Sequence, residues 1–137
     1  MRNIVKVGVG CMILKDGKVL LGKRKGSHGA GEYAWTGGHL EFGERIKECV
    51  EREVKEETGM KVKALKFLCM SNIIKYDKHY IDIQILTKHL SGKPEVLEPD
   101  RIEGWNWYPI KKLPKPMFEM SKRAVIAYKT GKYYFSK

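Results

Sequence analysis

The chain has 137 residues, which is enough for one domain with a hydrophobic core and too few for two. Its 27 Lys and Arg outnumber its 16 Asp and Glu, and the charge of +11 favours anionic partners such as nucleotides, nucleic acids or acidic membranes. No run approaches the ~20 apolar residues of a membrane span, and three widely spaced cysteines exclude a disulfide framework or zinc site. We therefore expect a cytoplasmic protein that forms a single domain over residues 1–137 and does not bind membranes.

The first half of the chain predicts a hairpin, a loop and a helix. Two strands, over residues 5–14 and 18–25, flank Asp16-Gly17, a pair that tolerates the positive φ angles of a tight hairpin turn. A flexible loop, a short strand and a tight turn are expected next, at residues 26–31, 32–35 and 36–38. A helix is expected from about residue 44 to 58, because Gly59 stands where a helix-ending glycine belongs.

The second half predicts three more strands and a second helix. Two long strands, at residues 62–76 and 79–90, are followed by a loop rich in Gly and Pro. A strand at residues 102–108 comes next, and its two tryptophans are expected to pack in the core and at its edge. The second helix is expected at residues 117–129. Strands that surround an internal helix, with another helix near the end, indicate a mixed α/β sandwich.

Carboxylates fall on the buried side of the first predicted helix. At roughly 100° per residue, an apolar arc is formed by Ile46, Cys49, Val50 and Val54. Glu53 and Glu57 lie inside this arc, and Glu56 lies at its edge. Ionised carboxylates in a dry core are costly unless they are paired or bound to metal, and neighbouring ones repel each other. The pattern therefore predicts a divalent metal site.

Residues 38–60 also carry a known signature. Every fixed position of the Nudix box is present at the correct spacing: Gly38, Glu44, Arg52, Glu53, Val54, Glu56, Glu57, Gly59 and Met60. The flanking segments VGVG, LLGKRKGS and GGHLEFGE, and the later EGW-W-LP pattern, extend the likeness. The chain thus resembles the Nudix hydrolases, and within them the MutT-type nucleotide triphosphate diphosphatases, over roughly residues 5–120.

This resemblance implies the Nudix α/β/α sandwich with a mixed β-sheet, and a hydrolase that acts on phosphoric anhydrides of nucleotides. The catalytic residues that it implies are Arg52, Glu53, Glu56, Glu57 and Glu44. Carboxylates supply the hard oxygen ligands that Mg²⁺ or Mn²⁺ prefers, and the likeness adds the carbonyl of Gly37 to the three helix glutamates as a metal ligand. Arg52 would orient a catalytic glutamate. Glu44, about 20 Å from Glu57 along a continuous helix, is expected to act outside the metal's own ligands.

The chemistry implied is attack of water at phosphorus, with metal ions that neutralise phosphate charge and lower the pKa of a bound water. Either Glu56 or Glu57 would accept the proton. Some relatives use a further glutamate from outside the box. Glu98 and Glu103 are both candidates for this additional base, and the sequence leaves the choice between them open.

Three basic residues are candidates for phosphate contact. Lys23 and Arg24 end a predicted strand near the expected site, and the alternative for both is a solvated strand end. His39 follows the double glycine, as in the MutT-type relatives, and its alternative is a structural hydrogen bond.

The base-side candidates are aromatic, because stacking on a base needs an exposed π face. Phe118 matches a base-side aromatic of the relatives, with helix packing as the alternative, and Trp35 and Tyr33 are candidates for the pocket wall. The chain departs from its relatives before the box, where it has Trp35-Thr36 in place of Leu-Pro. Without proline the turn is less rigid, so this departure bears on base specificity and leaves the metal site unchanged.

Three functional hypotheses follow. The first is an Mg²⁺-dependent pyrophosphohydrolase that cleaves nucleoside triphosphates to monophosphate and pyrophosphate, with purine deoxynucleotides such as dGTP or 8-oxo-dGTP first by resemblance and nucleotide-pool sanitation as the purpose. The second changes the substrate to a CTP-type pyrimidine, a dinucleoside polyphosphate, ADP-ribose or a prenyl diphosphate. The third is a non-catalytic nucleic-acid-binding module, against which the intact box argues. We expect no stable nucleic-acid partner, and the resemblance implies a homodimer.

Overall fold

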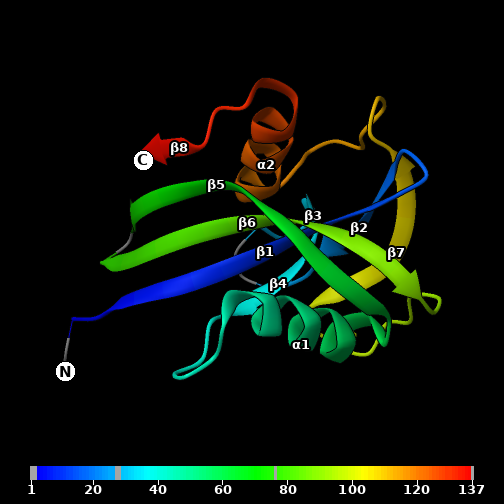
Figure 1. Cartoon of the computed structure of the whole chain (residues 1–137), viewed down its shortest axis with the longest axis horizontal. Coiled ribbons are helices and arrows are strands. Elements are labelled where there is room, and N and C mark those ends of the chain that lie inside the picture. The colour runs from blue at the N-terminus through cyan, green and yellow to red at the C-terminus, as the bar shows by residue number, and fades with distance from the viewer. Residues whose placement is uncertain (1–2, 27–28, 76, 137) are drawn as a thin grey trace.

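The computed structural model describes residues 3–26, 29–75 and 77–136 of the chain. Within these residues, eight strands form one mixed sheet that α1 covers on one face and α2 on the other (Figure 1). The elements are β1 (Val5–Lys15), β2 (Lys18–Arg24), β3 (Tyr33–Ala34), β4 (Thr36–His39), α1 (Ile46–Thr58), β5 (Lys61–Lys75), β6 (Lys78–Ser91), β7 (Ile102–Pro109), α2 (Glu119–Thr130) and β8 (Tyr134–Ser136). The predicted α/β sandwich with a mixed sheet is confirmed.

Strand β1 lies in the middle of the sheet and pairs with three other strands. Along one edge it pairs in parallel with β6 from Val5 to Leu14. Along the other edge it pairs with β2 only next to the hairpin turn, and β4 takes the place of β2 further back along β1. The tight turn predicted at residues 36–38 is therefore wrong, because these residues belong to β4. Their two glycines let β4 run beside β1, with Gly37 opposite Gly10 and Gly38 opposite Val9.

Side chains of β1 alternate between two hydrophobic cores, as the pleat of a strand requires. Val9, Cys11 and Ile13 point to the core under α1, whereas Met12 points to the core under α2. All three cysteines are free and buried. Trp105 packs in the core under α1, as expected.

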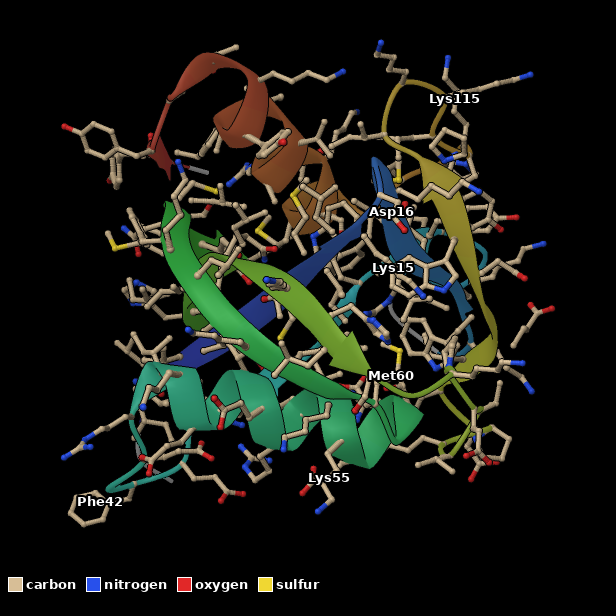
Figure 2. The ribbon with its side chains drawn as sticks, turned by 45° about the vertical axis from the view of Figure 1, so that its right-hand side comes forward. Lys15, Asp16, Phe42, Lys55, Met60 and Lys115 are labelled. Carbon is tan, nitrogen blue, oxygen red and sulfur yellow. The ribbon has the colours of Figure 1, made fainter. Side chains whose placement is uncertain are left out.

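Helix α1 begins after Glu44, two residues later than predicted. Arg45 precedes the first turn, and its backbone N–H donates to Glu48 Oε1 at 2.8 Å. The helix ends as predicted at Gly59, whose φ of 79° is left-handed. Ile46 was wrongly placed in the buried arc, since it is 36% exposed. Figure 2 shows Lys55 on the outer face of this helix and Phe42 at the tip of the preceding loop.

Most other boundaries agree with the prediction within two residues. The short strand β8, which pairs with the end of β5, was not expected. Positions 27 and 28 of the predicted loop, and position 76 of a predicted strand, lie outside the described residues. Neither described helix has the length and apolar run that crossing a lipid bilayer requires.

Candidate active site

Two buried carboxylates of α1 lie against the double glycine of β4. Glu53 and Glu57 are only 7% and 5% exposed. The backbone N–H of Gly37 donates to Glu57 Oε2 at 3.0 Å. A Cβ on Gly38 would overlap the carboxylate of Glu53, and one on Gly37 would lie 2.5 Å from the carbonyl oxygen of Val9. Only glycine at both positions lets the strand approach β1 and the carboxylates together.

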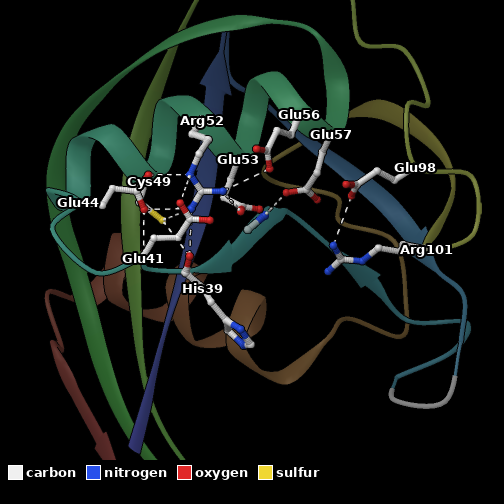
Figure 3. Close-up of polar contacts among 11 residues, drawn as sticks. His39, Glu41, Glu44, Cys49, Arg52, Glu53, Glu56, Glu57, Glu98 and Arg101 are labelled. Carbon is white, nitrogen blue, oxygen red and sulfur yellow. Dashed lines mark hydrogen bonds and ion pairs between the residues drawn. The ribbon is translucent and has the colours of Figure 1, made fainter.

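Arg52 links the buried carboxylates to the loop before the helix (Figure 3). Its Nε and Nη2 donate to both oxygens of Glu44, at 2.6 and 2.9 Å. Its Nη1 donates to Glu53 at 2.7 Å and to Glu56 at 3.2 Å, and Nη2 also reaches the carbonyl of His39 at 3.0 Å. These bonds from Arg52 lower the pKa of Glu44 to about 2 and raise that of Arg52. Glu44 therefore fixes Arg52, and Arg52 fixes two carboxylates.

The carboxyl group of Glu57 is buried beside another carboxylate, and its pKa is raised. Desolvation is the largest cause that raises its pKa to about 9, and the charge of Glu53 adds to it, against the opposing bond from Gly37. Arg101 is the cation whose charge lowers this pKa. Two carboxylates buried side by side are costly until a cation joins them. Their hard oxygen atoms match the ligands that Mg²⁺ and Mn²⁺ prefer, so these residues fit a divalent ion.

Glu56 stands apart from the buried pair. Its side chain is 52% exposed and its Oε1 accepts from Arg52. In the part of the chain that the structure describes, no three His, Cys, Asp or Glu side chains are already gathered as metal ligands. Arg52 Nη1 nevertheless donates to both Glu53 and Glu56, so this exposed carboxylate stays beside one member of the buried pair.

The chain matches the Nudix domain model over residues 5–128. It belongs to the Nudix hydrolase family. Over 118 residues it is 36% identical to an ADP-ribose pyrophosphatase of Methanocaldococcus jannaschii, covering 85% of this chain and 69% of that protein. It is 31% identical to an oxidized purine nucleoside triphosphate hydrolase of Danio rerio, covering 75% of this chain and 65% of the relative. A solved MutT Nudix hydrolase from Burkholderia pseudomallei superposes with a TM-score of 0.81 at 32% identity, covering 91% of this chain and 98% of that one.

These matches confirm three predictions: the Nudix resemblance, the fold and the hydrolase class. The structure places the charged residues of the box on α1 and on the loop before it, and Gly38 on β4. The relatives' names differ in substrate, so substrate class is a separate question.

Of the two candidates for an additional base, the structure brings only Glu98 to the site. The loop after β6 is held to the end of α1, because Leu97 N–H donates to the carbonyl of Glu57 at 3.4 Å. Figure 3 places Glu98 beside Glu57, with Arg101 donating to Glu98 at 3.3 Å. Glu103 lies on β7 with an exposed side chain.

The three candidates for phosphate contact differ in how close they lie to the buried carboxylates. Arg24 is half-buried with its guanidinium 4.2 Å from the ring centre of Phe118, and burial followed by the charge of Arg101 lowers its pKa. Glu57 acts in the opposite direction on that pKa, so Arg24 lies within the field of the carboxylates. Lys23 is exposed on β2. His39 offers Arg52 its carbonyl, whereas its ring turns away from the carboxylates and lies 5.7 Å from the ring of Tyr80.

The aromatic candidates lie near α2. Trp35 is 6% exposed and packs in the core under that helix, and its backbone N–H donates to Ser121 Oγ at 3.3 Å. Tyr33 packs partly buried against the same core. Phe118 immediately precedes α2, and the guanidinium of Arg24 lies over its ring.

Arg101 is the functional candidate that the sequence argument missed. It is one more basic residue in a basic chain, and only the fold brings its charge close enough to act on the pKa values of Arg24 and Glu57. Its position three residues after Glu98 was the available signal.

Proposed function

We propose that the protein is a divalent-metal-dependent Nudix pyrophosphohydrolase of nucleoside triphosphates, with Mg²⁺ as its ion and Mn²⁺ as a substitute. The supporting observation is the buried pair Glu53 and Glu57 beneath Gly37 and Gly38, held by Arg52. A non-catalytic module has no use for such a pair, because burying it costs stability. The coarser activity, hydrolysis of a nucleoside diphosphate derivative, follows from the family and its named relatives.

In this proposal the acidic residues bind the metal ion and the basic residues bind phosphate. Glu53 and Glu57 would hold the ion, with Glu56 and the Gly37 carbonyl as further ligands, and the bound ion supplies charge neutralisation and an acidified water. Arg52 keeps Glu53 and Glu56 in place and is itself held by Glu44. Arg24 and Arg101 bring two guanidinium groups to the side of the site where an anionic phosphate chain can bind. A carboxylate of Glu56, Glu57 or Glu98 accepts the proton of the attacking water.

Purine deoxynucleoside triphosphates, including oxidised dGTP, are the substrates we favour. The likeness to the oxidized purine hydrolase of Danio rerio supports this choice. ADP-ribose is the second candidate, supported by the 36% identity to the archaeal ADP-ribose pyrophosphatase. Both substrates contain a nucleoside diphosphate group, so the same carboxylates serve either one.

The test compares hydrolysis of a substrate panel in Mg²⁺ and in EDTA. We would measure kcat/KM for dGTP, 8-oxo-dGTP, dATP, dCTP and ADP-ribose, and use ¹⁸O water to identify the phosphorus that is attacked. Glu57→Gln and Glu53→Gln should each lower kcat by about 100-fold or more, the size expected for loss of a group that stabilises charge in the transition state. Glu51→Gln, on the exposed side of the same helix, is the matched control.

Two outcomes would contradict the proposal. One is activity within a few-fold of wild type for both buried-glutamate variants. The other is binding of single-stranded nucleic acid at physiological salt without hydrolysis of any nucleotide, which would favour the non-catalytic hypothesis. The predicted homodimer and cytoplasmic location stay predictions, which mass measurement in solution and fractionation would check.

A further inference from the structure

A polar pair lies on the sheet face under α2, on the side away from the buried carboxylates. Asp82 and Gln84 alternate along β6 with Leu86, which packs in the core under α2, so all three share this face. Gln84 Nε2 donates to Asp82 Oδ2 at 2.8 Å. Because a carboxylate only accepts, this bond fixes which end of the Gln84 amide is the carbonyl.

The carbonyl of Gln84 is buried without a donor. Gln84 is 2% exposed, and among the described residues nothing donates to its Oε1. Buried acceptors without a donor are rare and costly, so each one needs an explanation, such as a ligand that supplies the missing hydrogen.

Gly10 of β1 leaves room for the Gln84 side chain. It pairs with Gln84 across the sheet, and a Cβ there would overlap the Gln84 amide. Gly8 pairs with Asp82, where a Cβ would make only ordinary contact, 3.6 Å from Oδ1. The side-chain amide therefore lies directly over the backbone of β1, on a strip of sheet that carries no side chain of its own.

This strip leads to the carboxylate site. On its other edge, Gly10 pairs with Gly37, the residue whose N–H holds Glu57. Neighbouring strands lie about 4.8 Å apart, so the backbone of Gln84 is roughly 10 Å from that of Gly37. Asp82 and Gly8 are only partly buried, so the strip is open to solvent at that end.

A second unpartnered group lies on the same face. The indole Nε1 of Trp35 is buried and has no acceptor among the described residues. Trp35 directly precedes β4 and packs in the core under α2. The pairing with β1 gives the order of these groups along the sheet. Asp82 lies opposite Gly8 and Gln84 lies opposite Gly10. Trp35 comes next, because the residue after it, Thr36, lies opposite Cys11.

We propose that Asp82 and Gln84 bind the base of the nucleotide substrate and select a guanine-type hydrogen-bonding edge. This inference rests on the proposed function. Asp82 and Gln84 present two adjacent acceptors, and the indole of Trp35 presents a donor beyond them. Guanine offers the complement, an acceptor at O6 followed by donors at N1 and N2, whereas adenine offers a donor at N6 and an acceptor at N1.

A purely structural role for Asp82 and Gln84 does not explain why the fold keeps two costly polar groups here. Burial raises the pKa of Asp82 to about 6 against the bond from Gln84 and the charge of Arg123, a buried residue of α2, so its ionised form still costs stability in the fold. A pair kept for packing alone would satisfy the Gln84 carbonyl, and an apolar pair of similar shape would avoid both costs. Such costs are typical of residues that are retained for binding.

The test separates base recognition from hydrolysis. We would measure kcat/KM for dGTP and dATP with wild type, Gln84→Met and Asp82→Asn, and the affinity of dGMP and dAMP by calorimetry in EDTA. Thr87→Val is the matched control, because Thr87 is buried on the same strand but faces the other side. Wild type should prefer dGTP. Each test variant should lose about 10- to 100-fold on dGTP and less than about 3-fold on dATP, since unpairing a buried polar group penalises only the base that needs it.

Three results would overturn the inference: a wild-type preference for dATP or ADP-ribose, equal losses on dGTP and dATP, or an unchanged guanine preference in both variants. Thermal unfolding of each variant would be measured alongside, so that a loss caused by misfolding appears as an equal loss on both bases. If wild type hydrolyses none of these nucleotides, the proposed function fails. Weaker binding of dGMP, but not dAMP, to the two variants would still support the base site.

Discussion

The two glycines before the helix are required for different reasons. A Cβ on Gly38 would meet the end of the Glu53 side chain, which can move. A Cβ on Gly37 would meet the backbone of Val9, which cannot move without shifting β4. An added methyl group at Gly38 would therefore displace one side chain, whereas the same group at Gly37 would displace the strand.

We predict that Gly38→Ala folds normally and loses activity, because the added methyl group displaces the Glu53 carboxylate. A loss of about 100-fold in kcat is expected, as for other misplaced charged groups in active sites. Gly37→Ala should lose activity and also stability, by about 1–3 kcal/mol, the usual cost of overpacking. Activity assays with urea unfolding would check this. Equal stability of the two variants would contradict the argument.

Arg52 acts through its shape as much as its charge. Its fork spans Glu44 on one side and Glu53 and Glu56 on the other. Lysine carries the same charge on a single ammonium group and cannot hold a bidentate carboxylate.

We predict that Arg52→Lys lowers kcat by about 10- to 100-fold with a smaller change in KM, because it misplaces carboxylates and leaves the net charge unchanged. Glu44→Gln should act in the same direction and less strongly, since it weakens the hold on Arg52. Steady-state kinetics on the best substrate, with Glu51→Gln as control, would check both. A rise in KM alone would show that Arg52 binds substrate instead.

At the scale of elements, the late start of α1 gives Glu44 its role. In a continuous helix, Glu44 would lie beside Glu48 and point along the helix surface. Because α1 begins at Ile46, Glu44 belongs to the loop and folds back onto Arg52. The sequence concealed this boundary, since Arg45 stands in the capping position in place of the usual Ser, Thr, Asp or Asn.

Strand β6 carries a titratable group that affects stability. Burial raises the pKa of Asp82 to about 6 despite the bond from Gln84 and the charge of Arg123 on α2, so the folded state keeps its proton at pH values where the unfolded chain has lost it. Stability from this group is therefore lost as pH rises from about 4 to about 6. We predict that Asp82→Asn removes this loss and is more stable than wild type at pH 7.5 by up to about 3 kcal/mol, with little difference at pH 4.

Urea unfolding of both proteins at several pH values would measure this difference. Asp100→Asn, in an exposed loop, is the control and should follow wild type. A stability difference that does not change with pH would contradict the argument. Higher stability together with lost guanine selectivity would show that Asp82 is kept for binding.

At the scale of the whole molecule, a buried acidic site lies within a chain of charge +11. The positive surface attracts polyphosphates, and the carboxylates attract the cation that such substrates carry. Since the ion binds only the folded arrangement of Glu53 and Glu57, it should stabilise the fold.

We predict that Mg²⁺ at 100 times its Kd stabilises wild type by about 2.7 kcal/mol. Thermal unfolding with and without Mg²⁺ should show a higher Tm for wild type and for Glu51→Gln, and little change for Glu57→Gln. An equal shift in Glu57→Gln would place the ion elsewhere.

Much of the fold was visible in the sequence because it rests on local patterns. Alternating apolar residues predicted the long strands, and Gly59 predicted the end of α1. The tight turn predicted at residues 36–38 was wrong, because two glycines suit a turn and a close strand pair equally well. Strand β8 was missed because its three residues have no pattern of their own.

The sequence by itself determined the family and predicted the carboxylates of the candidate site. Their spacing along one helix is a local property that puts Glu53 and Glu57 on the same face as Cys49, Val50 and Val54, which the fold buries. Only the tertiary structure decided which distant segments lie near them and which groups share the other face of the sheet. The loop that carries Glu98 is held to the end of α1, the charge of Arg101 acts on Arg24 and Glu57, and Gln84 lies over Gly10 on the opposite face. These arrangements depend on strand register and loop path and join segments far apart in the chain, so no local pattern encodes them.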